Sequence, residues 1–197
     1  MRGRFIVLEG VDGTGKTTLA KRLADLVGDA VVTSEPTSGR IGSALRSGEL
    51  GDIPPAAEAL LFAADRAIHT AEIEKVLESG RWVVCDRYMG STVAYQSASM
   101  GEDADIEWLI GMQKNAVIEP DATFLLDMDP EESLRRVDSR GDKSRFEKLD
   151  FLRDVREGYL RLAERFGYCV IDASKDRDAV FADVLEALRE KGLYASE

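Results

Sequence analysis

The segment that most constrains this chain is a glycine-rich run near its start, Gly10-Val-Asp-Gly-Thr-Gly-Lys-Thr17. It matches the pattern G-x-x-x-x-G-K-[ST] and directly follows an apolar run, residues 5–8, that predicts a buried strand. Glycines let the backbone turn so that successive N–H groups surround an anion, and a helix beginning near Lys16 adds its positive end. A chance match somewhere in the chain has a probability on the order of 1%. The run therefore predicts a phosphate-binding loop between a strand and a helix.

Short apolar runs alternate with longer segments of helical periodicity along the whole chain. Uninterrupted runs of Val, Ile and Leu are typical of strands buried on both faces, as in a parallel sheet. Prolines mark the first turns of two predicted helices, near Pro55 and Pro130. The order strand, helix, strand, helix predicts a three-layer α/β fold with right-handed crossovers. The predicted strands are residues 5–8, 30–32, 82–85, 123–126 and 168–171.

The composition is that of one globular domain. Of the 197 residues, 44% are hydrophobic and 32% are charged, which supplies enough apolar material for a core. No linker, repeat or low-complexity tract divides the sequence, so we expect a single domain over residues 1–197. The net charge of −11 disfavours sequence-independent binding of nucleic acid, because such binding depends on a basic surface.

Several features indicate a soluble protein of the cytoplasm. Cys85 and Cys169 are too few for a disulfide framework, and both lie in apolar runs, so we expect buried, reduced thiols. His69 is the only histidine in the sequence, which excludes a histidine cluster for zinc. No run approaches the ~18 apolar residues of a membrane span, and the run at residues 5–8 is too short for a signal peptide. We therefore expect no membrane partner.

The phosphate-binding loop implies a nucleotide and a metal ion. Lys16 is expected to reach the β- and γ-phosphates, and the Thr17 hydroxyl is expected to bind Mg²⁺. Asp86 ends the apolar run 82–85 and suits a position beside that metal. The sequence lacks the N-K-x-D element that a guanine-reading switch would carry. We expect ATP or GTP as the ligand, and two classes remain: a kinase for a small molecule, and an NTP-driven switch or ATPase.

Arginines are concentrated in a glycine-containing segment between Arg135 and Arg145. Movable guanidinium groups can stabilise the charge that phosphoryl transfer spreads over the equatorial oxygens, while a closing lid excludes water. Asp138, Asp142 and Glu147 are interspersed, so a solvated helix end explains the pattern equally well. On spacing alone, both interpretations stay open.

Together, the loop and the arginine segment resemble the thymidylate kinase family, in the bacterial and archaeal branch that places its catalytic arginines in a lid. The run Arg140-Gly-Asp-Lys-Ser-Arg145 matches the family's lid pattern. The other branch has an arginine inside the loop, where Gly13 stands here, and the stretch from the lid to Asp150 is shorter than usual in bacterial members. The resemblance covers nearly the whole chain and implies a mobile lid at about residues 136–148.

Further segments resemble the family's acceptor site. In Phe62-Ala-Ala-Asp-Arg66, the resemblance implies that the Phe ring stacks on thymine and that Arg66 hydrogen-bonds the base. Four-residue spacing puts both on one helix face, although a core Phe beside a surface Arg would give the same pair. In Asp86-Arg-Tyr88, the resemblance implies that Arg87 binds the acceptor's monophosphate. Asp12 corresponds to the acidic position near the acceptor's 3′-hydroxyl.

The segments on either side of this block complete the resemblance. Ser91 or Thr92, together with Gln96, would contact the base, and Tyr95 would crowd the 2′ position of the sugar. Ser34-Glu-Pro36 followed by Arg46 resembles the segment after the family's second strand. Arg40 and Arg46 are both candidates for phosphate contacts there, and Arg46 is favoured.

The resemblance thus implies a full set of site residues. The ATP site would contain Gly10, Val11, Asp12, Gly13, Thr14, Gly15, Lys16, Thr17, Thr18 and Arg136. The dTMP site would contain Glu35, Arg46, Phe62, Arg66, Arg87, Ser91, Thr92, Tyr95 and Gln96. The catalytic residues would be Asp12, Lys16, Arg87, Arg140 and Arg145, and the Mg²⁺ ligands would be Thr17 and Asp86.

The fold and activity follow from the same resemblance. It implies the P-loop nucleoside monophosphate kinase fold, with a five-stranded parallel sheet in the order 2-3-1-4-5, and usually a homodimer. It implies transfer of the γ-phosphoryl group of ATP to dTMP with Mg²⁺, which gives dTDP and ADP for dTTP synthesis.

A deoxynucleoside kinase, or another P-loop nucleotide kinase, is the alternative. A sugar hydroxyl must lose its proton on phosphorylation, so a nucleoside kinase needs a general base, and Glu35 could serve. A nucleoside monophosphate has a second pKa of about 6 and is already an anion at neutral pH. Its phosphate needs arginines rather than a base. The Arg87 block and the Phe62/Arg66 pair fit a monophosphate acceptor better.

Overall fold

Five parallel strands form one sheet in the computed structural model, which describes residues 2–137 and 145–194. The strand order is β2-β3-β1-β4-β5, the order that the family resemblance implies. Each strand lies within two residues of its predicted bounds. The strands are β1 (Phe5–Glu9), β2 (Ala30–Ser34), β3 (Trp82–Asp86), β4 (Ala122–Asp127) and β5 (Cys169–Asp172).

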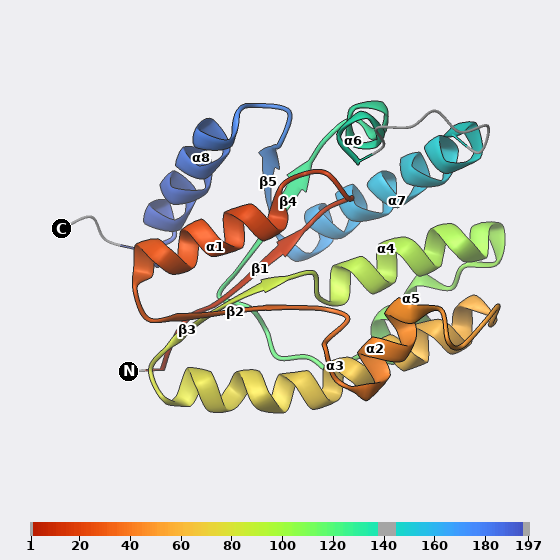
Figure 1. Ribbon diagram of the computed structural model, residues 1–197, viewed down its shortest axis with the longest axis horizontal. Coiled ribbons are helices and arrows are strands. Elements are labelled where there is room, and N and C mark those ends of the chain that lie inside the picture. Colours follow the sequence, from red (N-terminus) through yellow and green to blue (C-terminus); the bar gives the residue numbers. More distant parts are fainter. Residues whose placement is uncertain (1, 138–144, 195–197) are drawn as a thin grey trace.

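Helices cover both faces of this sheet, which confirms the three-layer prediction (Figure 1). One face packs against α1 and α8, and the other packs against α3, α4 and α7. In the described part of the chain, none of the helices is both long enough and apolar enough to cross a membrane. The helices are α1 (Lys16–Val27), α2 (Arg40–Ser47), α3 (Pro55–Glu78), α4 (Met89–Met100), α5 (Ile106–Gly111), α6 (Pro130–Val137), α7 (Arg145–Phe166) and α8 (Arg177–Glu190), with a 3-10 turn at Gly101–Asp103.

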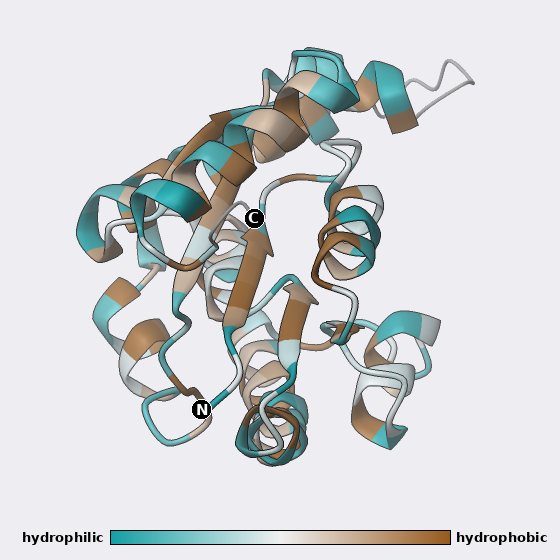
Figure 2. Cartoon of the chain, turned by 90° about the vertical axis from the view of Figure 1, so that its left-hand side faces the viewer, coloured by the Kyte–Doolittle hydropathy of each residue, from teal (hydrophilic) through white to brown (hydrophobic). Residues whose placement is uncertain are grey.

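Burial differs between the central and the edge strands. Every residue of β1 is at most 1% exposed, because Ile6 and Leu8 face one helical layer while Phe5 and Val7 face the other. The strands are the most uniformly hydrophobic elements (Figure 2). The prediction of burial on both faces is nevertheless wrong for β2 and β5, where Val32 and Val170 are 39% and 50% exposed. Each of these strands has a neighbour on one side only.

The two cysteines follow the same distinction. Cys85 lies in the central strand β3 and is fully buried, as predicted. Cys169 lies in the edge strand β5 and is only half-buried, so the prediction of a buried thiol is wrong there. Both are free cysteines.

The carboxyl ends of the parallel strands meet at one edge of the sheet. Leu8 of β1 is paired with Asp86 of β3, so the residues that follow β1 lie beside the end of β3. The phosphate-binding loop leaves β1 at this edge and leads into α1. The chain places β2 and β3 on one side of β1 and β4 and β5 on the other, so the strand order changes direction at β1. Open α/β sheets bind ligands at such a switch point.

Candidate active site

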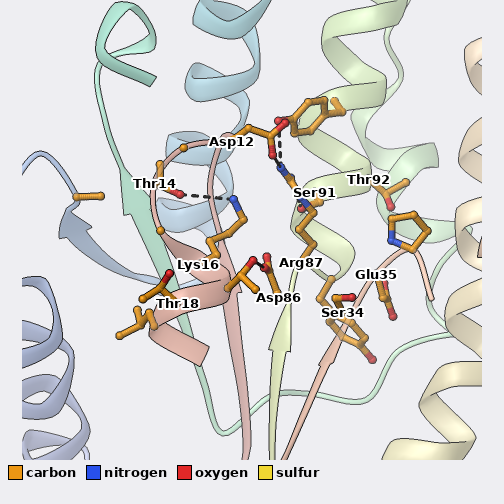
Figure 3. A pocket seen from close by; sticks show the side chains of 18 of the residues that line it. Asp12, Thr14, Lys16, Thr18, Ser34, Glu35, Asp86, Arg87, Ser91 and Thr92 are labelled. Carbon is orange, nitrogen blue, oxygen red and sulfur yellow. Dashed lines mark hydrogen bonds and ion pairs between the residues drawn. The ribbon is translucent and has the colours of Figure 1, made fainter. Parts of the chain in front are cut away.

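A cavity of about 1390 Å³ opens at this edge of the sheet. The phosphate-binding loop lines one part of it, and α3, α4 and the segment after β2 line another. Figure 3 shows Arg87 between Lys16 of the loop and Thr92 of α4. The cavity therefore joins the predicted donor and acceptor sites in one space.

The loop itself is built as the sequence predicts. Gly10 has a φ of +136°, and a Cβ there would lie 2.5 Å from the carbonyl oxygen of Leu126, so only glycine fits. Lys16 is 5% exposed, and its Nζ donates to the carbonyl oxygen of Val11 at 2.8 Å and lies 3.4 Å from Thr14 Oγ1 (Figure 3). Burial, together with the nearby Arg87 cation, lowers the pKa of Lys16 to about 8. An anion in the loop would offset both effects, because it favours the charged form of the lysine.

Thr17 and Asp86, the two predicted Mg²⁺ ligands, lie next to each other in the cavity lining. Thr17 Oγ1 donates to Asp86 Oδ2 at 2.6 Å. The other carboxylate oxygen, Asp86 Oδ1, is buried and has no hydrogen-bond partner within the described residues. A hydroxyl and a carboxylate oxygen whose lone pairs are free are hard oxygen donors, which Mg²⁺ prefers as ligands. The residues present therefore fit Mg²⁺.

Arg87 directly follows β3 and turns its side chain back over the loop. Its backbone has a φ of +71°, which is strained for a residue with a side chain, and its N–H donates to the carbonyl oxygen of Leu8 at 2.8 Å. Its guanidinium donates to Asp12 Oδ1 at 2.5 Å (Figure 3) and to Ser91 Oγ at 3.2 Å. Burial alone would raise the pKa of Asp12, but the cations of Arg87 and Lys16 hold that pKa below its usual value.

A buried carboxylate, Glu9, is linked to this arginine through Ser91 and Tyr159. Glu9 ends β1 and is fully buried. It accepts hydrogen bonds from the backbone N–H groups of Tyr88 and Ser91, from Ser91 Oγ at 2.5 Å and from Tyr159 OH at 3.3 Å. Tyr159 OH also lies 3.3 Å from Arg87 Nη1 and belongs to α7, the helix that follows the predicted lid. Burial raises the pKa of Glu9, although the Ser91 hydroxyl and Arg87 lower it in part.

Arg66 of α3 is held by four protein acceptors and is 1% exposed. Nε donates to Glu35 Oε2 at 2.7 Å, and Nη2 donates to the carbonyl oxygen of Tyr88 at 3.0 Å and to Thr92 Oγ1 at 2.9 Å. Nη1 donates to Gln113 Oε1. A guanidinium has five N–H groups, so four protein bonds leave one for a ligand in the cavity that Arg66 lines. This arginine is a buried, oriented donor rather than a surface charge.

Glu35 belongs to the same hydrogen-bond network as Arg66. Its Oε1 lies 2.9 Å from His69 Nδ1, and His69 Nε2 lies 2.7 Å from Thr33 Oγ1. Glu35 is 5% exposed and forms an ion pair with Arg66. A carboxylate held on both oxygens is poorly placed to take a proton from a sugar hydroxyl, which disfavours the nucleoside kinase alternative.

The predicted arginines of the cavity rim lie in different places. Arg46 lines the cavity, where its guanidinium donates to the carbonyl oxygens of Pro36 and Thr37. Arg40 begins α2 and lines a separate, smaller pocket. Arg136 on α6 lines the cavity and donates to the carbonyl oxygens of Ala173, at 2.9 Å, and Ser174, at 3.1 Å.

Comparisons with known proteins identify the family. The sequence profile described as thymidylate kinase matches residues 8–184. The chain belongs to the thymidylate kinase family. A probable thymidylate kinase of Methanococcoides burtonii is 39% identical, over 95% of this chain and 97% of that protein. One of Thermococcus kodakarensis is 44% identical, over 92% of this chain and 95% of that protein.

The fold agrees with that of a solved thymidylate kinase. The structure of thymidylate kinase from Candida albicans matches with a TM-score of 0.84, over 98% of this chain and 93% of that chain, at 24% identity. At this identity the match shows the fold, which is that of a P-loop nucleoside monophosphate kinase. Thymidylate kinases are ATP-dependent phosphotransferases, and the family assignment makes this chain an enzyme of that class.

Most of the residues that the thymidylate kinase resemblance implies line the one cavity. Gly10 and Val11 are buried residues of the loop that do not line the cavity, and the carbonyl oxygen of Val11 accepts a hydrogen bond from Lys16. Arg140 lies outside the described residues, as does most of the predicted lid at 136–148, and Arg145 begins α7. Among the residues that the resemblance implies, those that line the cavity are Asp12, Gly13, Thr14, Gly15, Lys16, Thr17, Thr18, Glu35, Arg46, Phe62, Arg66, Asp86, Arg87, Ser91, Thr92, Tyr95, Gln96 and Arg136.

Sequence reasoning missed the buried groups that hold these side chains. Asp65 accepts from Thr37 N and Thr37 Oγ1, both at 2.7 Å, and so fixes the segment after β2 against α3. Gln113 holds Arg66, and Tyr159 joins Glu9 to Arg87. A charged residue at the end of a fully apolar strand was a usable signal for Glu9, since such a carboxylate must find partners.

Proposed function

We propose that this enzyme transfers the γ-phosphoryl group of ATP to dTMP, giving dTDP and ADP. The observation that carries the proposal is the convergence of Lys16, Arg87 and Arg66 on one cavity. Lys16 belongs to the donor loop, and Arg87 suits a phosphate that lies beside this loop. Arg66 is a buried donor on the same helix as Phe62, at the spacing that lets a ring and a hydrogen-bond donor meet one base.

The chemistry requires charge stabilisation more than proton transfer. The acceptor phosphate is an anion at neutral pH, and its second pKa is about 6, so no general base is needed. The cations of Lys16 and Arg87 offset repulsion between the two nucleotides, and the N–H groups of the loop surround the donor phosphates. Asp12 and Tyr159 fix the direction of the Arg87 guanidinium. Preorganised donors of this kind cost little reorganisation during the reaction.

Thr17 and Asp86 are the residues that would hold Mg²⁺. When bound, the ion neutralises charge that develops on the transferred phosphoryl group. Arg136 would contact ATP from α6, close to the turn at Ala173. Arg140 and Arg145 would supply the remaining charge from the lid.

The acceptor base would lie between Phe62 and α4. Phe62 would stack on the ring, and Arg66 would donate its remaining N–H to it. Thr92 and Gln96 would contact the base from α4, and Tyr95 would border the sugar. Arg46 would approach the acceptor from α2, and Glu35, directly after β2, orients Arg66.

A panel of acceptors tests this function. ADP release is measured with dTMP, dUMP, CMP, AMP and thymidine, for the wild-type enzyme and for Lys16→Ala. We expect dTMP to be the best acceptor and Lys16→Ala to lose all but a few per cent of kcat while unfolding at the normal temperature. Preference for thymidine over dTMP would instead establish a nucleoside kinase.

We further propose that two copies associate through α3. Its solvent-facing side carries a continuous apolar stripe over three turns, formed by Leu60, Ala64, Ala67, Ile68 and Ala71. Leu60 and Ile68 are 52% and 59% exposed in the single chain. The alanines between them would let a second α3 approach closely.

We also propose the cytoplasm as the compartment, where the two free thiols stay reduced.

A further inference from the structure

The side-chain oxygen of Gln96 on α4 is buried without a protein hydrogen-bond partner among the described residues. The side chain is 3% exposed and lines the cavity. Its Nε2 donates to Glu58 Oε2 of α3 at 2.9 Å. Its Oε1 is buried and has no hydrogen-bond partner among the described residues. A buried acceptor without a partner is costly and calls for an explanation, such as a ligand that supplies the donor.

Glu58 determines which end of this amide is left free. An ionised carboxylate only accepts hydrogen bonds, so it requires the NH₂ group of the amide. The reverse orientation would place Gln96 Oε1 against Glu58 Oε2, with two acceptors about 2.9 Å apart, and would be repulsive. The orientation therefore follows from chemistry and leaves an acceptor for the cavity.

We propose that Glu58 is a positioning residue that selects 4-keto pyrimidines over 4-amino pyrimidines by fixing the Gln96 amide. The inference rests on the proposed function, with a pyrimidine monophosphate as acceptor. Thymine and uracil carry a hydrogen on N3 and can donate it to Gln96 Oε1. Cytosine has an unprotonated N3, whose lone pair would face that oxygen. Arg66 acts in the same sense, because its free N–H matches a keto oxygen and not an amino group.

The arrangement depends on one helix face. Glu58, Phe62 and Arg66 lie at i, i+4 and i+8 of α3. The same helix thus presents the amide's anchor, the stacking ring and the keto-reading donor. Glu58 also lines the cavity, and in this proposal it acts on the base through Gln96.

The test replaces Glu58 by glutamine. Glu58→Gln keeps the size and a hydrogen bond, but its amide can pair with Gln96 in either orientation. Glu74→Gln is the matched control, since Glu74 is an exposed carboxylate elsewhere on α3. For both variants and the wild-type enzyme, kcat and KM are measured for dTMP, and the inhibition constant of dCMP is measured against dTMP. dUMP serves as a second keto acceptor.

We expect Glu58→Gln to bind dCMP at least about tenfold more tightly than the wild-type enzyme does, since the amide can now turn its NH₂ to N3. The dTMP and dUMP KM values should change less than about threefold, and kcat should be retained. Glu74→Gln should match the wild-type enzyme. Glu58→Met, which removes the anchor altogether, should relax selectivity in the same direction.

An unchanged ratio of dCMP to dTMP affinity in both Glu58 variants would overturn the inference. Parallel weakening of dTMP and dCMP would do the same, because it would reveal a purely structural role. Thermal unfolding of each variant separates these results from a loss of fold. Failure of the wild-type enzyme to phosphorylate dTMP would overturn the proposed function itself, and the inference with it, before any variant is compared.

Discussion

Arg66 and Arg87 both lie at the acceptor end of the cavity, but their surroundings differ. Arg66 is 1% exposed and neutralises the buried Glu35. The side chain of Arg87 is 18% exposed and pairs with Asp12, whose side chain is 71% exposed. Removing a partner from a buried ion pair leaves an uncompensated charge, whereas an exposed partner is solvated by water.

We therefore predict that replacing each of these arginines by alanine impairs the enzyme in a different way. Arg66→Ala should lower the free energy of unfolding by about 3–5 kcal/mol and erode selectivity for thymine. Arg87→Ala should cost clearly less stability than Arg66→Ala and raise the KM of every monophosphate acceptor at least about tenfold, because a charge-assisted phosphate contact is lost. Urea unfolding and kinetics with dTMP, dUMP and CMP measure both effects. Equal stability losses for the two variants would contradict the distinction.

Glu9 leads to a prediction about pH. Burial raises its pKa above the ordinary 4.5, so between 4.5 and the raised value the native state holds more protons than the unfolded chain. Ionisation of Glu9 therefore lowers the free energy of unfolding as the pH rises through this window. Above the window, the full loss of stability remains. Glutamine can keep the bonds from Tyr88 and Ser91 without carrying the charge.

Glu9→Gln should accordingly gain stability relative to the wild-type enzyme as the pH rises above the ordinary carboxyl pKa of 4.5 and through the raised pKa of Glu9. Urea unfolding at several pH values measures the difference. Glu78→Gln, at an exposed position of α3, is the matched control. A difference in unfolding free energy that is the same at every pH would show that Glu9 titrates alike in both states.

Sequence alone could predict residues whose chemistry is local. Lys16, Thr17 and Asp86 follow from a motif and from the end of a strand. Tyr159 could not be predicted, because it lies 150 residues from Glu9 in sequence and meets it only after α7 has packed on α4. The role of Glu58 likewise requires knowledge of which helix faces Gln96.

At the scale of elements, the phosphate-binding loop and α6 are packed against each other. Gly13 has a φ of +81°, and a Cβ there would lie 3.0 Å from the carbonyl oxygen of Ser133 and 3.1 Å from Val137 Cγ2. Ser133 Oγ donates to the carbonyl oxygen of Asp12 at 2.6 Å. A side chain at this position would be strained by the positive φ and would require these neighbours to shift, which disfavours the arginine that the other branch of the family has in its loop. The charge must then be supplied by another element.

We predict that the lid supplies it. Arg140→Ala and Arg145→Ala should each lower kcat at least ~100-fold while changing the dTMP KM only a few-fold, because an arginine engaged as charge migrates acts on the transition state. Arg135→Ala is the control, since Arg135 is an exposed arginine of α6 outside the predicted site. Steady-state kinetics with saturating ATP measure all three. Near-normal kcat in both lid variants would mean that the catalytic charge comes from elsewhere.

At the scale of the whole molecule, the sequence predicted the three layers of the fold but not which strands lie at the edges of the sheet. Alternating strands and helices were enough for the three-layer fold, since few other arrangements bury such runs. The exposure of Val32 and Val170 depends on which strands end the sheet, and strand order is a property of the assembled fold. The free side of α3 is a similar case. The helix is apolar on more than one face, a pattern that fits a dimer seam and deep burial equally well, and the structure shows that five of its apolar residues face solvent in the single chain.

That stripe gives the prediction for the assembled protein. Burying half-exposed Leu60 and Ile68 from two copies would contribute about 1–2 kcal/mol for each side chain, which favours a dimer. Ala67→Glu and Ile68→Glu would place charges in that seam and should yield monomers of 21.7 kDa, whereas the wild-type protein should have twice this mass. Leu26→Glu, at a 38% exposed position of α1, should remain dimeric. Light scattering after size-exclusion chromatography measures the masses, and a wild-type monomer would contradict the proposed association through α3.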